Sequence, residues 1–109
     1  MIKCENPDNS VFHDEYFLPL LSVYTYKPED KKETMKICQR NRNNYSLTGA
    51  IFSKDEEFIR EANEEFKYSA GNFYINDKST GAVVGQQPFG GSGKSGTNDK
   101  AGDINALYR

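Results

Sequence analysis

The sequence of 109 residues predicts an α/β fold in which short strands form a parallel sheet and helices connect them. Apolar segments with the length and the β-branched or aromatic content of buried strands recur along the chain. The segments between them have apolar residues at helical spacing. This alternation favours right-handed crossovers within one parallel layer. A glycine-rich segment follows the last strand and is expected to form a long loop.

The first predicted strand spans residues 20–26, and residues 1–5 are a candidate for a further strand. Pro28 suits the first turn of a helix that is expected to run to about residue 42. Met35 and Cys38 would share one face of this helix. Its basic residues alternate with acidic ones, which indicates a solvated face rather than a phosphate-binding patch.

A second buried strand is predicted at residues 47–52, followed by a capping-box pattern from Ser53 to Glu56. The helix that this pattern starts has an apolar face made of Phe58, Ile59, Ala62 and Phe66. Gly71 ends the helix, and residues 72–76 form the third predicted strand.

The segment 77–102 is too rich in glycine for regular structure. Its glycines are Gly81, Gly85, Gly90, Gly91, Gly93, Gly96 and Gly102. Residues 93–95 read Gly-Lys-Ser, but a phosphate-binding loop needs glycine at the position of Pro88. We therefore expect a functional loop that lies beyond the carboxyl end of the sheet, where α/β folds bind ligands.

Composition excludes several classes of function. The net charge is −2 and the mean hydropathy is −0.81, so no positive field attracts nucleic acid and no apolar run predicts a membrane span. Cys4 and Cys38 are isolated residues, which favours reduced thiols. His13 beside Asp14 and Glu15 is interpreted as part of a polar turn, and no metal site is expected.

Three motifs carry a resemblance to a known family: Ser-Ala-Gly-Asn-Phe-Tyr-Ile-Asn-Asp-Lys-Ser-Thr-Gly at 69–81, Gln-Gln-Pro-Phe-Gly-Gly at 86–91 and Ser-Gly-Thr-Asn-Asp-Lys at 95–100. The chain resembles the delta-1-pyrroline-5-carboxylate dehydrogenases of the aldehyde dehydrogenase superfamily. The resemblance implies that residues 1–109 are the C-terminal part of a catalytic domain. Residues 76–103 would then form its glycine-rich substrate-anchor and active-site loop.

The resemblance further implies an NAD-dependent oxidation of L-glutamate γ-semialdehyde to glutamate in proline catabolism. The family's cysteine nucleophile and general-base glutamate have no match here, so no catalytic residue is assigned and the chain alone is expected to be inactive. The resemblance also implies a mitochondrial-matrix homo-oligomer, and we expect this chain to carry no targeting segment and to stop where the family's oligomerisation strand begins. The alternative is a non-catalytic module, or an inert remnant, that associates with full-length subunits.

For the cofactor, residues 15–19 resemble the family's Glu-x-Phe-Gly-Pro segment. Glu15 would accept hydrogen bonds from the nicotinamide-ribose hydroxyls, and Phe17 would pack beside the nicotinamide. Leu18 stands where the family has glycine, so it adds a bulky side chain where the backbone should pass close to NAD.

For the substrate, Gly81 and Ala82 match the family's aldehyde-anchor loop, whose backbone amides hold the substrate carboxylate. Many members have serine where this chain has Ala82, so only the amide contact transfers. Phe89 matches the aromatic residue that packs on the aliphatic chain of the substrate.

Overall fold

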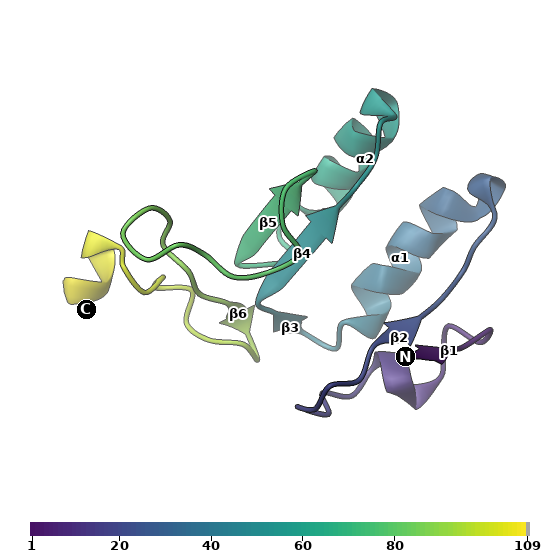
Figure 1. Cartoon of the computed structure of the whole chain (residues 1–109), viewed down its shortest axis with the longest axis horizontal. Helices are drawn as coiled ribbons and strands as arrows, with labels where there is room; N and C mark the ends of the chain where they lie inside the picture. Colours follow the sequence, from purple (N-terminus) through teal and green to yellow (C-terminus); the bar gives the residue numbers. More distant parts are fainter. Residues whose placement is uncertain (109) are drawn as a thin grey trace. The chain divides into compact units, whose positions relative to one another are not determined.

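The computed structural model describes residues 1–108 and divides the chain into two compact units. Unit 1 comprises residues 1–43, and unit 2 begins at Asn44. Figure 1 shows their elements coloured along the sequence. The described residues form three separate two-stranded ladders rather than the single parallel layer that the sequence predicts. Most of these strands are two residues long, so they offer too few hydrogen-bonding groups to extend a common sheet.

Unit 1 contains a parallel ladder, a helix and two short 3₁₀ turns. The ladder pairs β1 (Ile2–Lys3) with β2 (Ser22–Val23), which confirms a strand within residues 1–5. The predicted strand 20–26 is shortened to the two residues of β2. The remaining elements are η1 (Ser10–Phe12), η2 (Pro28–Asp30) and α1 (Lys31–Asn41).

Helix α1 begins where the sequence indicates, with Pro28 in the 3₁₀ turn that leads into it. It ends because Asn43 and Asn44 take positive φ angles of 47° and 64°, a conformation that asparagine tolerates better than most residues. Met35 is buried, as expected. Cys38, three residues further along the same helix, is exposed.

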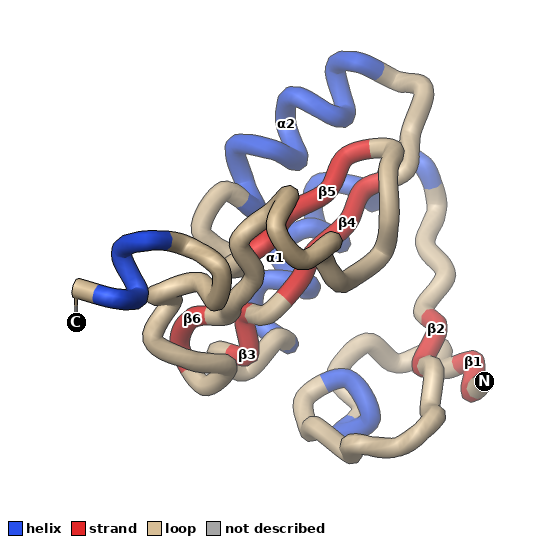
Figure 2. The backbone as a smooth tube through the Cα atoms, turned by 60° about the vertical axis from the view of Figure 1, so that its left-hand side comes forward, coloured by secondary structure: helices blue, strands red, loops and turns tan. Residues whose placement is uncertain are grey.

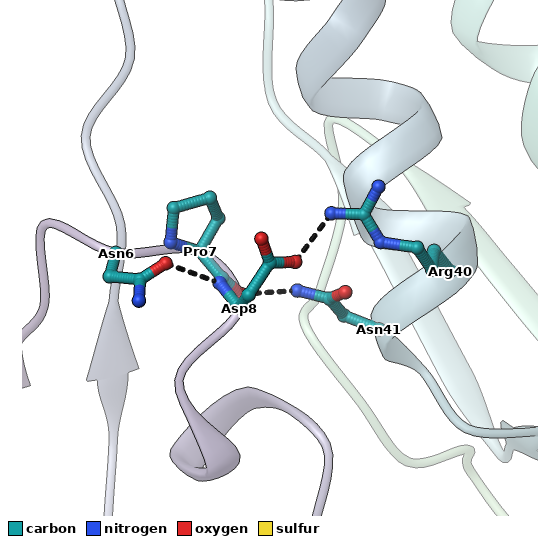
Figure 3. A network of polar contacts seen from close by, with 5 residues as sticks. All are labelled: Asn6, Pro7, Asp8, Arg40 and Asn41. Carbon is teal, nitrogen blue, oxygen red and sulfur yellow. Dashed lines mark hydrogen bonds and ion pairs between the residues drawn. The ribbon is translucent and has the colours of Figure 1, made fainter.

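Polar contacts hold the N-terminal segment of unit 1 against α1 (Figure 3). The Arg40 guanidinium forms an ion pair with Asp8 at 2.5 Å, and the Asn41 amide donates to the Pro7 carbonyl. The amide of Asp8 in turn donates to the side chain of Asn6 at 3.0 Å. Because the ion pair is largely exposed, it adds little stability, and the buried Asn41 contact contributes more.

Unit 2 is organised around a parallel pair of strands, β4 (Thr48–Ile51) and β5 (Asn72–Ile75), which pair residue by residue over their whole length. The connection between them is α2 (Glu56–Phe66), which ends five residues before Gly71, so the prediction that Gly71 stops the helix is wrong. The short strands β3 (Tyr45–Ser46) and β6 (Ser92–Gly93) form an antiparallel ladder, and η3 (Ile104–Leu107) follows. The prediction that residues 77–102 have no regular structure is therefore wrong at β6, because pairing with β3 outweighs the glycine content there. Both views show α2 lying along the β4–β5 pair (Figures 1 and 2).

The predicted apolar face of α2 packs on this strand pair. Ala62 is completely buried, and the rings of Phe66 and Phe73 lie 6.2 Å apart. The predicted cap at Ser53 is wrong: Asp55 caps the helix and accepts a hydrogen bond from the Phe58 amide at 3.1 Å. Asp55 stands three residues before Phe58, which is the spacing at which a short carboxylate reaches a free amide of the first turn.

Candidate functional site

Strand β5 presents two buried polar side chains on one face. Successive residues of a strand point to opposite faces, so Asn72 and Tyr74 share the face opposite Phe73. Asn72 is 6 % exposed and Tyr74 is 5 % exposed. Buried polar groups need hydrogen-bond partners, and both side chains find them in the segment that follows the strand.

Asn72 holds the backbone on both sides of Phe89. Its side-chain nitrogen donates to the Pro88 carbonyl at 3.0 Å, and its side-chain oxygen accepts from the Gly90 amide at 3.2 Å. Phe89 itself exchanges two backbone hydrogen bonds of 3.0 Å with Ala101. The main chain at Phe89 is therefore fixed from two directions.

Lys100 adds a third fixed point. Its ammonium group donates to the carbonyl oxygens of Gly71 and Gly90. Burial lowers the pKa of Lys100, whereas the two carbonyl acceptors favour its charged form and oppose that shift. The approach of the two backbones requires glycine, because a Cβ on Gly71 would lie 1.9 Å from the Gly90 oxygen.

Tyr74 contacts the loop at Gly81. The Tyr74 hydroxyl donates to the Gly81 carbonyl, and the side-chain oxygen of Gln87 lies 3.2 Å from the same hydroxyl. The ammonium of Lys78 lies 5.4 Å from the centre of the Tyr74 ring. Gly81 has a φ of 80°, a left-handed conformation that glycine adopts without strain.

These contacts border a cavity of about 280 Å³. Its lining is mostly apolar or backbone and consists of Ala82, Val84, Gly85, Gln87, Phe89, Ala101 and Gly102. Two of the three residues that the sequence assigns to the substrate, Ala82 and Phe89, thus lie on one cavity, and Gly81 immediately precedes it. The arrangement can hold a small molecule that has an apolar chain and a group able to accept hydrogen bonds from the backbone.

The two residues assigned to the cofactor lie in unit 1. Glu15 is exposed, and Phe17 is 94 % exposed with a φ of 49°. Leu18 is 56 % exposed, so its side chain is not part of a packed core. This segment offers a free carboxylate and a free aromatic face next to a leucine.

Neither cysteine has the surroundings of a catalytic nucleophile. Desolvation raises the pKa of the Cys38 thiol, so less of it is thiolate at neutral pH. Cys4 is half-buried near the start of the chain, and its thiol donates to the Asn6 carbonyl. Within residues 1–108, no group of side chains could hold a metal ion, and no helix has the length and apolar content to cross a membrane.

Comparison with known proteins identifies the family. Residues 2–108 match the model of the "Aldehyde dehydrogenase family". The chain belongs to this family. It is 50 % identical over 109 residues to the mitochondrial delta-1-pyrroline-5-carboxylate dehydrogenase of Bos taurus, covering 100 % of this chain and 19 % of that protein. The chain thus spans about a fifth of the length of this relative.

Solved structures of this family have the same fold. The delta-pyrroline-5-carboxylate dehydrogenase of Mycobacterium tuberculosis matches with a TM-score of 0.81 and 44 % identity over 96 % of this chain and 19 % of that one. A structure of the Mycobacterium tuberculosis enzyme bound with NAD matches with a TM-score of 0.78 and 43 % identity, over 96 % of this chain and 18 % of that one. Aldehyde dehydrogenase structure therefore extends over both units.

Sequence reasoning missed the side chains that organise the cavity. In the sequence, Asn72 and Tyr74 were noted only as members of the motif at 69–81, and Lys100 only as the last residue of the motif at 95–100. One signal was available: polar residues at alternate positions of a predicted buried strand require buried partners. Which partners they find could not be deduced, because the loop that supplies them has no periodic pattern.

Proposed function

We propose that this chain forms part of an NAD-dependent dehydrogenase that oxidises L-glutamate γ-semialdehyde, derived from delta-1-pyrroline-5-carboxylate, to glutamate in proline catabolism. The observation that carries the proposal is the cavity that Ala82 and Phe89 both line: Ala82 directly follows the family motif at 69–81, and Phe89 lies in the motif at 86–91. Unit 2 then supplies the substrate-binding wall, and unit 1 supplies part of the cofactor site.

The wall suits an aldehyde that carries a carboxylate at its far end. The amides of Gly81 and Ala82 donate to that carboxylate, since consecutive amides at a left-handed glycine can converge on one anion. The ring of Phe89 covers the aliphatic chain of the substrate. Because the amides bind the carboxylate and the Phe89 ring packs on the middle of the substrate, the aldehyde end is the end that faces the reacting groups.

The exposed segment of unit 1 fits an NAD contact. Glu15 has a solvent-facing carboxylate that can accept hydrogen bonds from ribose hydroxyls, and Phe17 presents a bare ring to the nicotinamide side. Bound NAD supplies the acceptor for the hydride that leaves the substrate. Leu18 adds a side chain at the point of closest backbone approach and weakens this contact.

The covalent steps depend on groups that we place outside this chain: a cysteine thiolate that attacks the aldehyde carbon, and a glutamate that activates water for thioester hydrolysis. The raised pKa of Cys38 agrees with that assignment. A mitochondrial location is part of the same proposal, by similarity to the bovine relative. A homo-oligomeric assembly is proposed from membership of the aldehyde dehydrogenase family.

A hybrid enzyme tests the proposal. In the bovine hybrid, this chain replaces the matched 109 residues of the Bos taurus relative. We expect the hybrid to form NADH from glutamate γ-semialdehyde, and we expect the isolated chain to show no turnover above a heat-treated control. A folded hybrid without activity would contradict the proposal, and so would turnover by the isolated chain that is lost on Cys38→Ser.

The interaction-module alternative predicts a different result. Mixing the isolated chain with the bovine enzyme should then give co-elution in size-exclusion chromatography, together with an inactive hybrid. If the isolated chain co-elutes and the hybrid is also active, the chain binds the bovine enzyme and the dehydrogenase function still holds.

A further inference from the structure

We propose that Tyr74 and Asn72 are positioning residues that set the two halves of the substrate wall separately: Tyr74 orients the amide that binds the carboxylate, and Asn72 fixes the aromatic residue that covers the chain. The inference rests on the proposed function, because it assigns roles within the same site. It concerns residues that do not themselves line the cavity.

The argument for Tyr74 rests on the geometry of one peptide group. The carbonyl that accepts the Tyr74 hydroxyl belongs to Gly81, and the amide on the other side of the same peptide bond belongs to Ala82. A trans peptide is planar, with its carbonyl and its N–H pointing in opposite directions. Holding the Gly81 oxygen toward Tyr74 therefore directs the Ala82 N–H away from the strand.

The same hydrogen bond also strengthens the Ala82 amide as a donor. A carbonyl that accepts a hydrogen bond polarises its peptide group, so the N–H becomes a better donor to an anion. Glycine at position 81 has no intrinsic preference for its φ of 80° over other conformations. Because Tyr74 is 5 % exposed and extends from a fully paired strand, it can restrict this otherwise free turn.

The argument for Asn72 concerns the two peptides that flank Phe89. Its side chain donates to the carbonyl of the first, from Pro88, and accepts from the amide of the second, from Gly90. Fixing both peptide planes fixes the backbone angles of Phe89 between them. The direction in which the Cα–Cβ bond of Phe89 points is thus set in part by a carboxamide two residues before Tyr74 on the same strand face.

The two roles predict different kinetic signatures in the bovine hybrid. For Tyr74→Phe, which keeps the ring, we expect KM for glutamate γ-semialdehyde to rise about ten-fold with kcat nearly unchanged, the loss of about one strong hydrogen bond. KM for butanal, which has no carboxylate, should stay the same. For Asn72→Ala, KM should rise for both aldehydes, since the wall around Phe89 contacts the chain that they share.

Matched variants separate positioning from folding. Tyr68→Phe removes a hydroxyl from a tyrosine of unit 2 that is 83 % exposed, and it should change neither KM. Asn72→Asp keeps the acceptor for the Gly90 amide but replaces the donor to Pro88 with a buried carboxylate oxygen that repels this carbonyl, so we expect an effect at least as large as for Asn72→Ala. Equal losses on both aldehydes for Tyr74→Phe, or no loss on either, would overturn its assignment. Unchanged KM values in Asn72→Ala would overturn the assignment of Asn72.

A binding measurement keeps the two proposals distinguishable. Glutamate, which retains the same carboxylate, is titrated calorimetrically into the hybrid and its Tyr74→Phe variant. A roughly ten-fold weaker Kd in the variant supports the role of Tyr74 even if the hybrid proves inactive, and inactivity counts against the proposed function alone. Equal Kd values in the two proteins contradict the role of Tyr74 whether or not the hybrid turns over.

Discussion

The two units differ in how much of their structure they support themselves. Unit 2 has a four-residue parallel ladder, a helix packed on it and the buried residues Ile51, Ala62 and Tyr74. In unit 1 the ladder has two residues, and Met35 is the one buried apolar residue among those described there. The residues of the proposed substrate wall therefore belong to a unit with a small apolar core, whereas the segment with Glu15 and Phe17 belongs to a unit with little buried apolar surface.

Unit 1 also contains a cavity, which agrees with its small amount of buried apolar surface. It has a volume of about 400 Å³, and its lining includes the rings of Phe12, Tyr24 and Tyr26 together with Ile37. The side-chain oxygen of Asn41, another lining residue, is buried and has no hydrogen-bond partner within residues 1–108. Aromatic side chains that line a cavity lack contacts on that side, so we expect the stability of unit 1 to depend on further protein.

The largest effect is expected for the isolated chain. Without more apolar surface to bury, it should form a molten or self-associated species rather than a cooperative monomer, because exposed strand edges and apolar side chains promote association. Light scattering and urea denaturation followed by circular dichroism measure this. A monodisperse monomer with one sharp transition would show that unit 1 needs no partner.

Hydrogen exchange on the same sample measures the local stability of each unit separately. Amides of β4 and β5 should exchange more slowly than those of β1 and β2, since protection follows local burial and pairing. Equal exchange rates in the two ladders would remove the distinction between the units.

The next largest effect is expected where two backbones of unit 2 meet. Gly71→Ala in the bovine hybrid should destabilise it by about 3 kcal/mol, because the new methyl group overlaps the Gly90 oxygen. Gly85→Ala is the control: nothing lies within 4 Å of its added Cβ, and only its φ of 81° is strained, at a cost of about 1 kcal/mol. Urea denaturation measures the free energy of unfolding of both variants. Equal losses of this free energy would show that a small backbone shift relieves the contact at position 71.

A smaller effect is expected at the cofactor segment of unit 1. Leu18→Gly in the hybrid should tighten NAD binding a few-fold, because it removes a side chain where the backbone approaches the cofactor. Leu21→Gly is a suitable control, since Leu21 is also exposed and lies just outside the segment 15–19. Fluorescence titration with NAD gives both dissociation constants, and an unchanged value for Leu18→Gly would contradict the steric explanation.

The smallest effect concerns Cys38. Its pKa is raised by desolvation, so at neutral pH its thiolate fraction is lower than that of an ordinary thiol, and the fraction recovers only as the pH rises toward that higher pKa. A timed pulse of iodoacetamide on the folded hybrid should label Cys38 more slowly than the same pulse after unfolding in urea, as read by peptide mass spectrometry. Faster labelling in the folded state would mean that unit 1 activates this thiol.

Much of the fold could be predicted because it is encoded locally. The apolar spacing along α2 and the β-branched and aromatic content of β4 and β5 are visible in short windows, and the structure confirms these elements within a few residues. Pro28 and Asn43 likewise mark the ends of α1 through their own backbone preferences. The family motifs also supplied Ala82 and Phe89, which share one cavity.

What the sequence by itself determined is therefore the helices α1 and α2, the strands β4 and β5 and the family, whereas the residues nearest the substrate are a proposal. Only the tertiary structure decided that the strands form separate ladders, that Asp55 rather than Ser53 caps α2, and that Asn72, Tyr74 and Lys100 hold the loop. These outcomes depend on which backbone groups of the loop lie next to the strand. The path of a glycine-rich loop cannot be predicted from sequence periodicity, because the loop has none.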